Sequence, residues 1–83
     1  MAKEIIVAQA QTIADRLNDP NGLWFYYKAV RVLGFQTCYE LTSHALDMSR
    51  RGKLRETPGA YFNGCVMQEI EKRELRWNTN RHD

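Results

Sequence analysis

The sequence predicts an all-α fold, one compact bundle of about four helices in an orthogonal or bundle-like arrangement. Apolar residues recur at three- and four-residue steps along most of the 83 residues, which is the spacing of a helix face. Glycine or proline interrupts this pattern between the helical segments. A chain of this length makes a single domain. We place this helical domain at residues 1–77 and expect a flexible C-terminal tail at residues 78–83.

The first helix is expected over residues 3–17, because one face of this segment is apolar and the opposite face is polar. The segment "NDPNG" at residues 18–22 then ends it. Asp19 or Asn21 is placed to cap the next helix, since a short oxygen-bearing side chain accepts hydrogen bonds from free N–H groups. The apolar face consists of Ile6, Ala10, Ile13, Ala14 and Leu17.

The second helix is expected over residues 23–33, "LWFYYKAVRVL", where only Lys28 and Arg31 form a polar stripe. A helix that is apolar on nearly every side is normally buried, and a small domain has few elements with which to surround it. A homodimer partner is the simplest further cover. The alternatives are tyrosines that lie half-exposed with their hydroxyls in water, or aromatic rings that stack on nucleobases. The residues predicted for a dimer or partner interface are Trp24, Phe25, Val32 and Trp77. For Trp77 the alternative is that it packs back on the bundle.

Gly34 is expected to end the second helix as a left-handed cap, and the third helix is expected over residues 36–51, with Gly52 ending it. Its apolar and polar residues separate into two faces. The apolar sector contains Cys38, Leu41, Thr42, Ala45, Met48 and Ser49, and Glu40, His44, Asp47 and Arg51 lie opposite.

The fourth helix is expected to begin at Pro58, with Thr57 as its N-cap, because proline lacks the N–H that has no partner at this position. Further along, Glu69 and Arg73 are spaced for an i,i+4 contact where the helix extends beyond the core. The apolar face consists of Tyr61, Phe62, Cys65, Val66 and Ile70.

No sequence motif points to catalysis, so we predict that the protein is not an enzyme and uses no cofactor or small-molecule substrate. A P-loop and a GxGxxG motif are absent from the sequence. Glu40, His44 and Asp47 share a helix face, but the other histidine, His82, lies in the tail. We therefore interpret the three as a solvated face with an i,i+4 pair of Glu40 and His44, and predict no metal site.

The spacing of the cysteines and the hydropathy of the sequence indicate the cellular compartment. Cys38 and Cys65 belong to no CxxC motif and fall on apolar faces, which indicates buried thiols in a reducing compartment. No apolar stretch approaches the roughly 20 residues of a membrane span. The sequence shows no signal-peptide pattern. We therefore predict a cytoplasmic protein without a membrane partner.

The order helix, glycine, helix at residues 23–51 raises the question of a helix-turn-helix. In that motif the sixth residue after the turn glycine is apolar and packs inward, whereas Glu40 occupies this position here. The outward face of the third helix is also acidic, through Glu40 and Asp47. The pattern therefore disfavours a recognition helix in this segment.

Charge is distributed unevenly along the chain. Residues 1–49 carry four basic and five acidic residues, whereas residues 50–83 carry eight basic and five acidic ones. Arg50, Arg51, Lys53 and Arg55 precede a helix N-terminus, whose free N–H groups carry partial positive charge. Gly59 would let an anion approach the backbone there, which is the composition of a phosphate site. Glu56 could occupy that end itself, and the alternative is a solvated connector. We expect Lys72, Arg73 and Arg76 to assist.

The segment at residues 24–70 resembles a helical segment of bacterial replication-initiation and mobile-element proteins. In those proteins an aromatic-rich helix precedes a helix ending in a basic, glycine-containing turn, and a phrase of the form (Asn/Thr)-Pro-(Gly/Ala)-Ala-Tyr-Phe opens the next helix. The segment accompanies DNA-binding parts, so the resemblance implies association with nucleic-acid machinery. The matching residues are Tyr26, Tyr27, Ala45, Gly52, Lys53, Thr57, Pro58, Gly59, Ala60, Tyr61 and Phe62.

Two functions follow from the sequence as hypotheses. The first is a small module associated with nucleic-acid machinery, which binds DNA or RNA phosphate through the basic segment before the fourth helix. The second is a dimeric interaction or adaptor protein that does not contact nucleic acid directly. The two are compatible, because a dimer doubles the basic surface.

Overall fold

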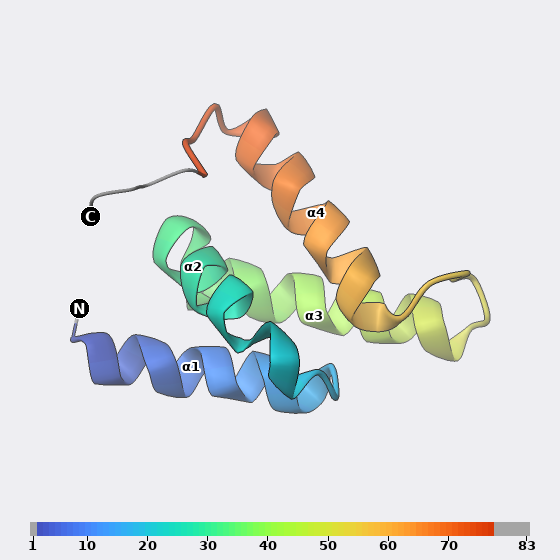
Figure 1. Ribbon diagram of the computed structural model, residues 1–83. Helices are drawn as coiled ribbons and strands as arrows, with labels where there is room; N and C mark the ends of the chain where they lie inside the picture. Colours follow the sequence, from blue (N-terminus) through green and yellow to red (C-terminus); the bar gives the residue numbers. More distant parts are fainter. Residues whose placement is uncertain (1, 78–83) are drawn as a thin grey trace.

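The computed structural model describes residues 2–77, and these residues form an all-α fold (Figure 1). The predicted fold class is confirmed, and the expected bounds of the first three helices differ from the observed ones by at most one residue at either end. The predicted tail, residues 78–83, lies outside the described residues. In chain order the elements are α1 (Lys3–Arg16), the 3-10 turn η1 (Pro20–Gly22), α2 (Leu23–Leu33), α3 (Phe35–Arg50) and α4 (Pro58–Lys72).

Three of these helices end in the same hydrogen-bonded turn, the Schellman motif. At the end of α3, Lys53 donates its backbone N–H to the carbonyl of Met48 and Gly52 donates to Ser49, both over 3.0 Å. The same pair of bonds closes α1 and α4. The motif requires a positive φ angle after the helix cap, which the chain adopts at Asn18 (54°), Gly52 (72°) and Glu74 (59°).

Gly34 alone separates α2 from α3, and it has φ 89° and ψ 153°. The positive φ confirms the need for glycine, but this ψ lies outside the left-handed helical region that we expected. Gly34 still donates its backbone N–H to Val30 over 2.8 Å, as a residue at the end of a helix does. The extended ψ instead turns the chain directly into the next helix.

The predicted cap of α2 is wrong. Gly22 precedes this helix, and neither Asp19 nor Asn21 caps it through a side chain. The carboxylate of Asp19 instead accepts a hydrogen bond from the hydroxyl of Tyr26 over 2.7 Å. A buried phenol hydroxyl requires a hydrogen-bond acceptor, and Asp19 supplies it. Capping patterns consider only neighbouring residues, so they did not predict this role for Asp19.

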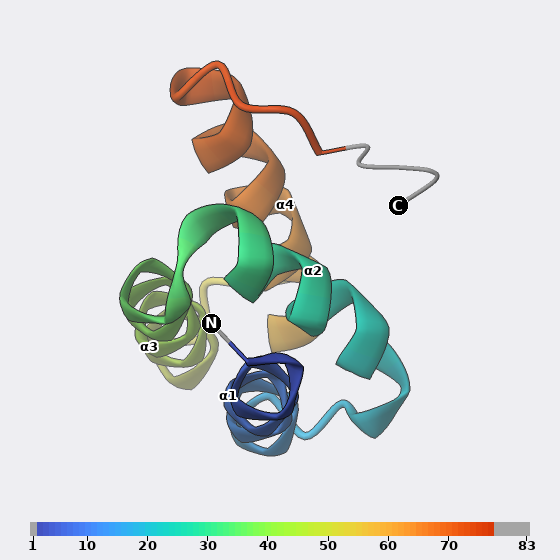
Figure 2. The ribbon, with the colours of Figure 1, turned by 90° about the vertical axis from the view of Figure 1, so that its left-hand side faces the viewer.

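The hydrophobic core lies where the four helices meet, and α2 contacts all of the other three. Figure 2 shows α1 and α3 nearly end-on, with α2 crossing above α1. The helices of this one chain therefore cover the inner face of α2, whereas Trp24 and Arg31 on its outer face are exposed. Its buried residues are Tyr26, Ala29, Val30 and Leu33, and the other helices contribute Ala10, Ile13, Ala14, Leu17, Cys38, Ala45, Phe62, Val66 and Ile70.

Helix α4 packs mainly on α3, and its C-terminal turns extend beyond the rest of the bundle (Figure 1). Among residues 2–77, two side-chain hydrogen bonds join this part of the chain to α3 in addition to the packing in the core. His44 of α3 and Tyr61 of α4 share a hydrogen bond of 3.0 Å between Nε2 and the hydroxyl. Near the other end, Arg73 donates to Thr37 over 3.2 Å. Both contacts join residues far apart in sequence, so neither was visible in local spacing.

Within residues 2–77, none of the helices combines the length and the apolar character required to cross a lipid bilayer.

Candidate functional site

The candidate site is the segment between α3 and α4, which we call the basic loop, residues 50–57. It begins at the Schellman turn that closes α3 and ends at Thr57, the N-cap of α4 (Figure 1). Leu54 is half-buried and lies between exposed neighbours, so the loop is attached to the fold in its middle as well as at its ends. The four predicted cationic side chains, Arg50, Arg51, Lys53 and Arg55, are all exposed.

Asp47 partly neutralises the first two of these cations. Arg50 approaches one carboxylate oxygen of Asp47 at 2.9 Å and Arg51 approaches the other at 3.3 Å. Both arginine side chains remain mostly exposed, at 73% and 59%. Ion pairs this exposed are weak, typically below about 1 kcal/mol, so an anionic ligand can replace Asp47.

The other two cations of the basic loop, Lys53 and Arg55, form no ion pair with a described carboxylate. Among residues 2–77, no carboxylate oxygen lies within 4.0 Å of the charged atoms of Lys53 or Arg55. Glu56 follows directly but lines a depression with Tyr61, Gly64, Cys65 and Gln68 on the side of α4. The loop therefore presents two cations without an internal counter-ion beside two whose counter-ion is shared.

The N-terminus of α4 differs from the predicted anion site. Thr57 caps it as expected, accepting a hydrogen bond from the N–H of Ala60 over 3.2 Å. Gly59, however, is buried, and a Cβ atom placed on it would lie 3.0 Å from the Tyr26 hydroxyl and 3.1 Å from the Asp19 carboxylate. The missing side chain of Gly59 makes room for this internal pair, so it does not provide an approach for an external anion.

The second group of predicted cations lies at the other end of α4. This helix has 15 residues and is therefore about 22 Å long, so the structure does not bring Lys72, Arg73 and Arg76 next to the basic loop. Arg73 binds Glu69 over 2.8 Å, as predicted, and also reaches Thr37. It therefore ties α4 to α3, while Lys72 and Arg76 are exposed.

The four residues predicted for a dimer interface divide into two kinds. Phe25 and Trp77 pack against each other with ring centroids 5.0 Å apart, so each covers part of the other within one chain. Val32 is half-buried. Trp24 is the exception, since 65% of its surface is exposed. The sequence left open whether Trp77 packs back on the bundle, and the structure shows that it does.

The acidic face of α3 is divided among separate partners. Glu40 accepts from Gln36 over 3.0 Å, Asp47 binds the two arginines, and His44 contacts Tyr61. Within residues 2–77, no three histidine, cysteine or acidic side chains are grouped as metal ligands would be. His82 lies outside the described residues. The expected Glu40–His44 pair is replaced by the contact across to α4.

Both cysteines are free thiols, and their surroundings favour the protonated form. Burial raises the pKa of Cys38 to about 12, although nearby Arg73 acts in the opposite direction. Burial also raises the pKa of Cys65. The pKa of Tyr61 is raised by burial and by Cys65 beside it. Since the thiolate is the reactive form of cysteine, these environments do not activate a nucleophile near neutral pH.

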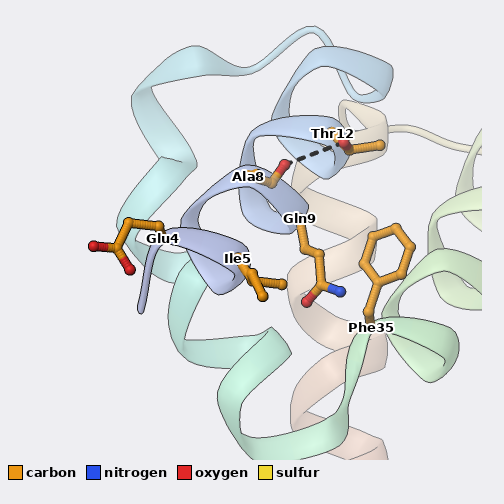
Figure 3. Close-up of a pocket in the computed structure, with 6 residues that line it drawn as sticks. All are labelled: Glu4, Ile5, Ala8, Gln9, Thr12 and Phe35. Atoms are coloured by element: carbon orange, nitrogen blue, oxygen red, sulfur yellow. Dashed lines mark hydrogen bonds between the residues drawn. The ribbon is translucent and has the colours of Figure 1, made fainter. Parts of the chain in front are cut away.

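A shallow depression of about 420 Å³ lies on the outer side of α1, next to the start of α3. Figure 3 shows Gln9 between Ile5 and Phe35, with Glu4 pointing away from them. The Oε1 atom of Gln9 is buried there without a hydrogen-bond partner among residues 2–77. The depression is lined by Glu4, Ile5, Ala8, Gln9, Thr12 and Phe35. This lining is mostly apolar, and none of its residues belongs to the predicted site.

Comparison with protein-family models, curated proteins and solved structures found no match for this chain. The resemblance of residues 24–70 to replication-initiation proteins accordingly stays a prediction. The structure gives the phrase "TPGAYF" a local role of its own: Thr57 caps α4, Gly59 admits the Asp19–Tyr26 pair, and Phe62 is fully buried.

Proposed function

We propose that this protein is a small, non-enzymatic helical module that works with nucleic-acid machinery and binds DNA or RNA phosphate through its basic loop. The observation that carries this proposal is the exposure of four cations within six residues, on a loop whose two ends are held by hydrogen bonds. Two of these cations, Lys53 and Arg55, have no carboxylate close by in the described chain.

The contacts would be made by side chains. Because Thr57 already occupies the N–H of Ala60 and Gly59 packs inward, the first turn of α4 offers little free backbone to a ligand. Arg50 and Arg51 can each exchange a carboxylate oxygen of Asp47 for a phosphate oxygen, since a guanidinium binds both in the same planar geometry. Such contacts carry no base preference, which fits a module that holds the nucleic-acid backbone.

The test is the salt dependence of binding to duplex DNA, measured by fluorescence anisotropy from about 50 to about 200 mM salt. Alanine at Arg51, Lys53 and Arg55 together is expected to weaken binding and to flatten the plot of log K against log salt concentration, by about 0.9 for each phosphate that the variant no longer neutralises. A matched control removes three charges that belong to neither group of predicted cations, at Lys3, Arg16 and Arg81, and is expected to retain most of the slope.

Two results would contradict the proposal. The first is a wild-type protein that shows no salt-dependent binding to duplex DNA at about 50 mM salt. The second is an equal loss of affinity in the two triple variants, because net charge would then explain binding without the basic loop.

A dimeric interaction protein without direct nucleic-acid contact is the second candidate, and the 65% exposure of Trp24 favours it. It predicts a concentration-dependent dimer in sedimentation velocity that becomes monomeric when Trp24 is replaced by Glu. A dimer unchanged by this substitution would argue against the interface. For either function we propose a cytoplasmic location, supported by the two free thiols.

A further inference from the structure

The outward face of α2 carries one aromatic and two cationic side chains in a row. Trp24, Lys28 and Arg31 lie at positions i, i+4 and i+7, so they stand above one another on a single helix face. The buried residues of α2 occupy the opposite face, since Tyr26, Ala29, Val30 and Leu33 all point into the core. The helix is therefore oriented with these three side chains directed away from the bundle.

Neighbouring rings hold this row in place. Tyr27 meets Trp24 edge-on, with centroids 5.7 Å apart, and the guanidinium of Arg31 lies 6.0 Å from the centroid of the Tyr27 ring. The ammonium of Lys28 lies 4.7 Å from the centroid of Trp77, which in turn packs on Phe25. We call the surface formed by Trp24, Tyr27, Lys28, Arg31 and Trp77 the aromatic–cation stripe.

The charge of the stripe has one sign. Helix α2 contains no aspartate or glutamate, and among residues 2–77 neither Lys28 nor Arg31 has a carboxylate oxygen within 4.0 Å. A twofold contact between two copies of α2 would bring four of these cations into one small interface. Like charges in one interface oppose association. The stripe is thus better matched to an anionic partner that also offers flat apolar rings.

We propose that the aromatic–cation stripe binds single-stranded nucleic acid, with a base stacked on Trp24 and backbone phosphates in contact with Lys28 and Arg31. Aromatic platforms beside cations are the general means by which proteins hold single strands, because every base has a face that can stack. In a duplex these faces are already covered by neighbouring base pairs, so the stripe selects unpaired strands. All residues of the stripe except Trp77 lie on α2, and the basic loop lies between α3 and α4, so the two surfaces can be tested separately.

The probe is a single-stranded oligothymidylate of about 15 nucleotides, a length in the range that small binding folds occupy. The chain has two tryptophans, so Trp77→Phe leaves Trp24 as the fluorescent reporter. Adding the oligothymidylate is expected to quench the emission of this variant. An emission that does not change at saturating oligothymidylate would overturn the proposal, because a base stacked on Trp24 must alter it.

Substitutions at Trp24 test the stacking step. Trp24→Ala is expected to weaken oligothymidylate binding about 5- to 100-fold, whereas Trp24→Phe, which keeps a ring, is expected to retain most of the affinity. Because Trp24 is exposed, both variants are expected to keep the wild-type circular dichroism and thermal midpoint. Arg31→Glu is expected to weaken binding and to reduce its salt slope by about one. Equal affinity of the Trp24→Ala variant and the wild type would overturn the proposal.

Two further outcomes separate this inference from the functions proposed above. In the triple alanine variant of the basic loop, combined with Trp77→Phe, oligothymidylate is still expected to quench the emission of Trp24, because that signal reports binding at the stripe. Loss of binding in that variant, but not in Trp24→Ala, would assign the strand to the basic loop and overturn the stripe. A wild-type dimer that dissociates on Trp24→Ala, without oligothymidylate binding, would make the same surface a protein interface and also overturn it.

Discussion

Tyr26 donates its hydroxyl hydrogen to Oδ2 of Asp19 over 2.7 Å, in a contact that joins the start of η1 to the buried face of α2. The ring of Tyr26 is 1% exposed and meets Phe62 of α4 edge-on, with centroids 5.4 Å apart. Gly59 of α4 lies against both the hydroxyl and the carboxylate. One hydrogen-bonded pair therefore lies where η1, α2 and the beginning of α4 meet.

Tyr26→Phe is expected to lower the free energy of unfolding by about 1.5 to 3 kcal/mol, because it removes a hydrogen bond to a charged acceptor and leaves the carboxylate partly buried. Tyr27→Phe is the matched control, since the Tyr27 ring is half-buried and its hydroxyl makes no side-chain hydrogen bond within residues 2–77. Urea denaturation measures both. Equal stability of the two variants would show that the Asp19–Tyr26 bond contributes nothing.

Gly59→Ala is expected to destabilise the protein by about 1 to 3 kcal/mol, because the new Cβ atom would crowd the Tyr26 hydroxyl and the Asp19 carboxylate. Gly64→Ala, in the same helix, places a methyl group where, among residues 2–77, only its chain neighbours and the backbone of its own helix lie within 4 Å. It is expected to stabilise the protein by about 0.5 to 1 kcal/mol through helix propensity. Opposite signs in thermal or urea unfolding would support the packing of Gly59, and a stabilising Gly59→Ala would contradict it.

Glu74→Gly is expected to raise the free energy of unfolding by about 0.5 to 1 kcal/mol, because Glu74 has φ 59° in the turn that ends α4. The equivalent residue after α3 is Gly52, with φ 72°, and among residues 2–77 only its chain neighbours would lie within 4 Å of a new Cβ atom. Gly52→Ala is therefore expected to cost about 1 kcal/mol through backbone strain alone. Differential scanning calorimetry of the two variants would test these expectations. A loss of stability on Glu74→Gly would contradict the positive φ angle of Glu74 in this turn.

Stability is expected to fall as the pH rises above about 9. Burial raises the pKa of Cys38 from 9.0 to about 12, and burial together with Asp19 raises the pKa of Tyr26. The unfolded chain releases both protons at lower pH than the folded chain, so alkaline conditions favour unfolding. Each group contributes a slope of up to about 1.4 kcal/mol per pH unit.

The urea midpoint, measured between about pH 7 and about pH 11, tests this dependence. Cys38→Ala is the matched variant, which is expected to be less stable at neutral pH but to lose stability less steeply above about pH 9. A wild-type stability that stays constant through this range would show that neither group keeps its proton in the folded protein.

The fold was largely predictable because its main signals are local. The spacing of Ala10, Ile13 and Leu17 places one face of α1 in the core, and the pair Thr57–Pro58 marks the start of α4. Turn residues at Gly34 and Gly52 indicated the helix ends for the same reason. The Glu74 turn had no such signal, since glutamate rarely adopts a positive φ angle.

The candidate site was predictable only in part, because it depends on contacts between residues distant in sequence. The position of the basic loop followed from "RRGKLR", but the role of Gly59 depends on Asp19, which is 40 positions earlier. The hydrogen bond between His44 and Tyr61 likewise joins two helices, and no periodic pattern within either helix predicts it. The packing of Trp77 back onto Phe25 is also a tertiary contact that local spacing does not determine.

The hydrogen bonds at both ends of the basic loop lower the conformational entropy that the loop would lose when it binds a ligand. The bond from Lys53 to Met48 closes one end, and the Thr57 cap and the inward-packed Gly59 close the other. The backbone between them is short and is already ordered by folding. A ligand at this loop therefore restricts only long cationic side chains, so more of the free energy of each contact appears as affinity.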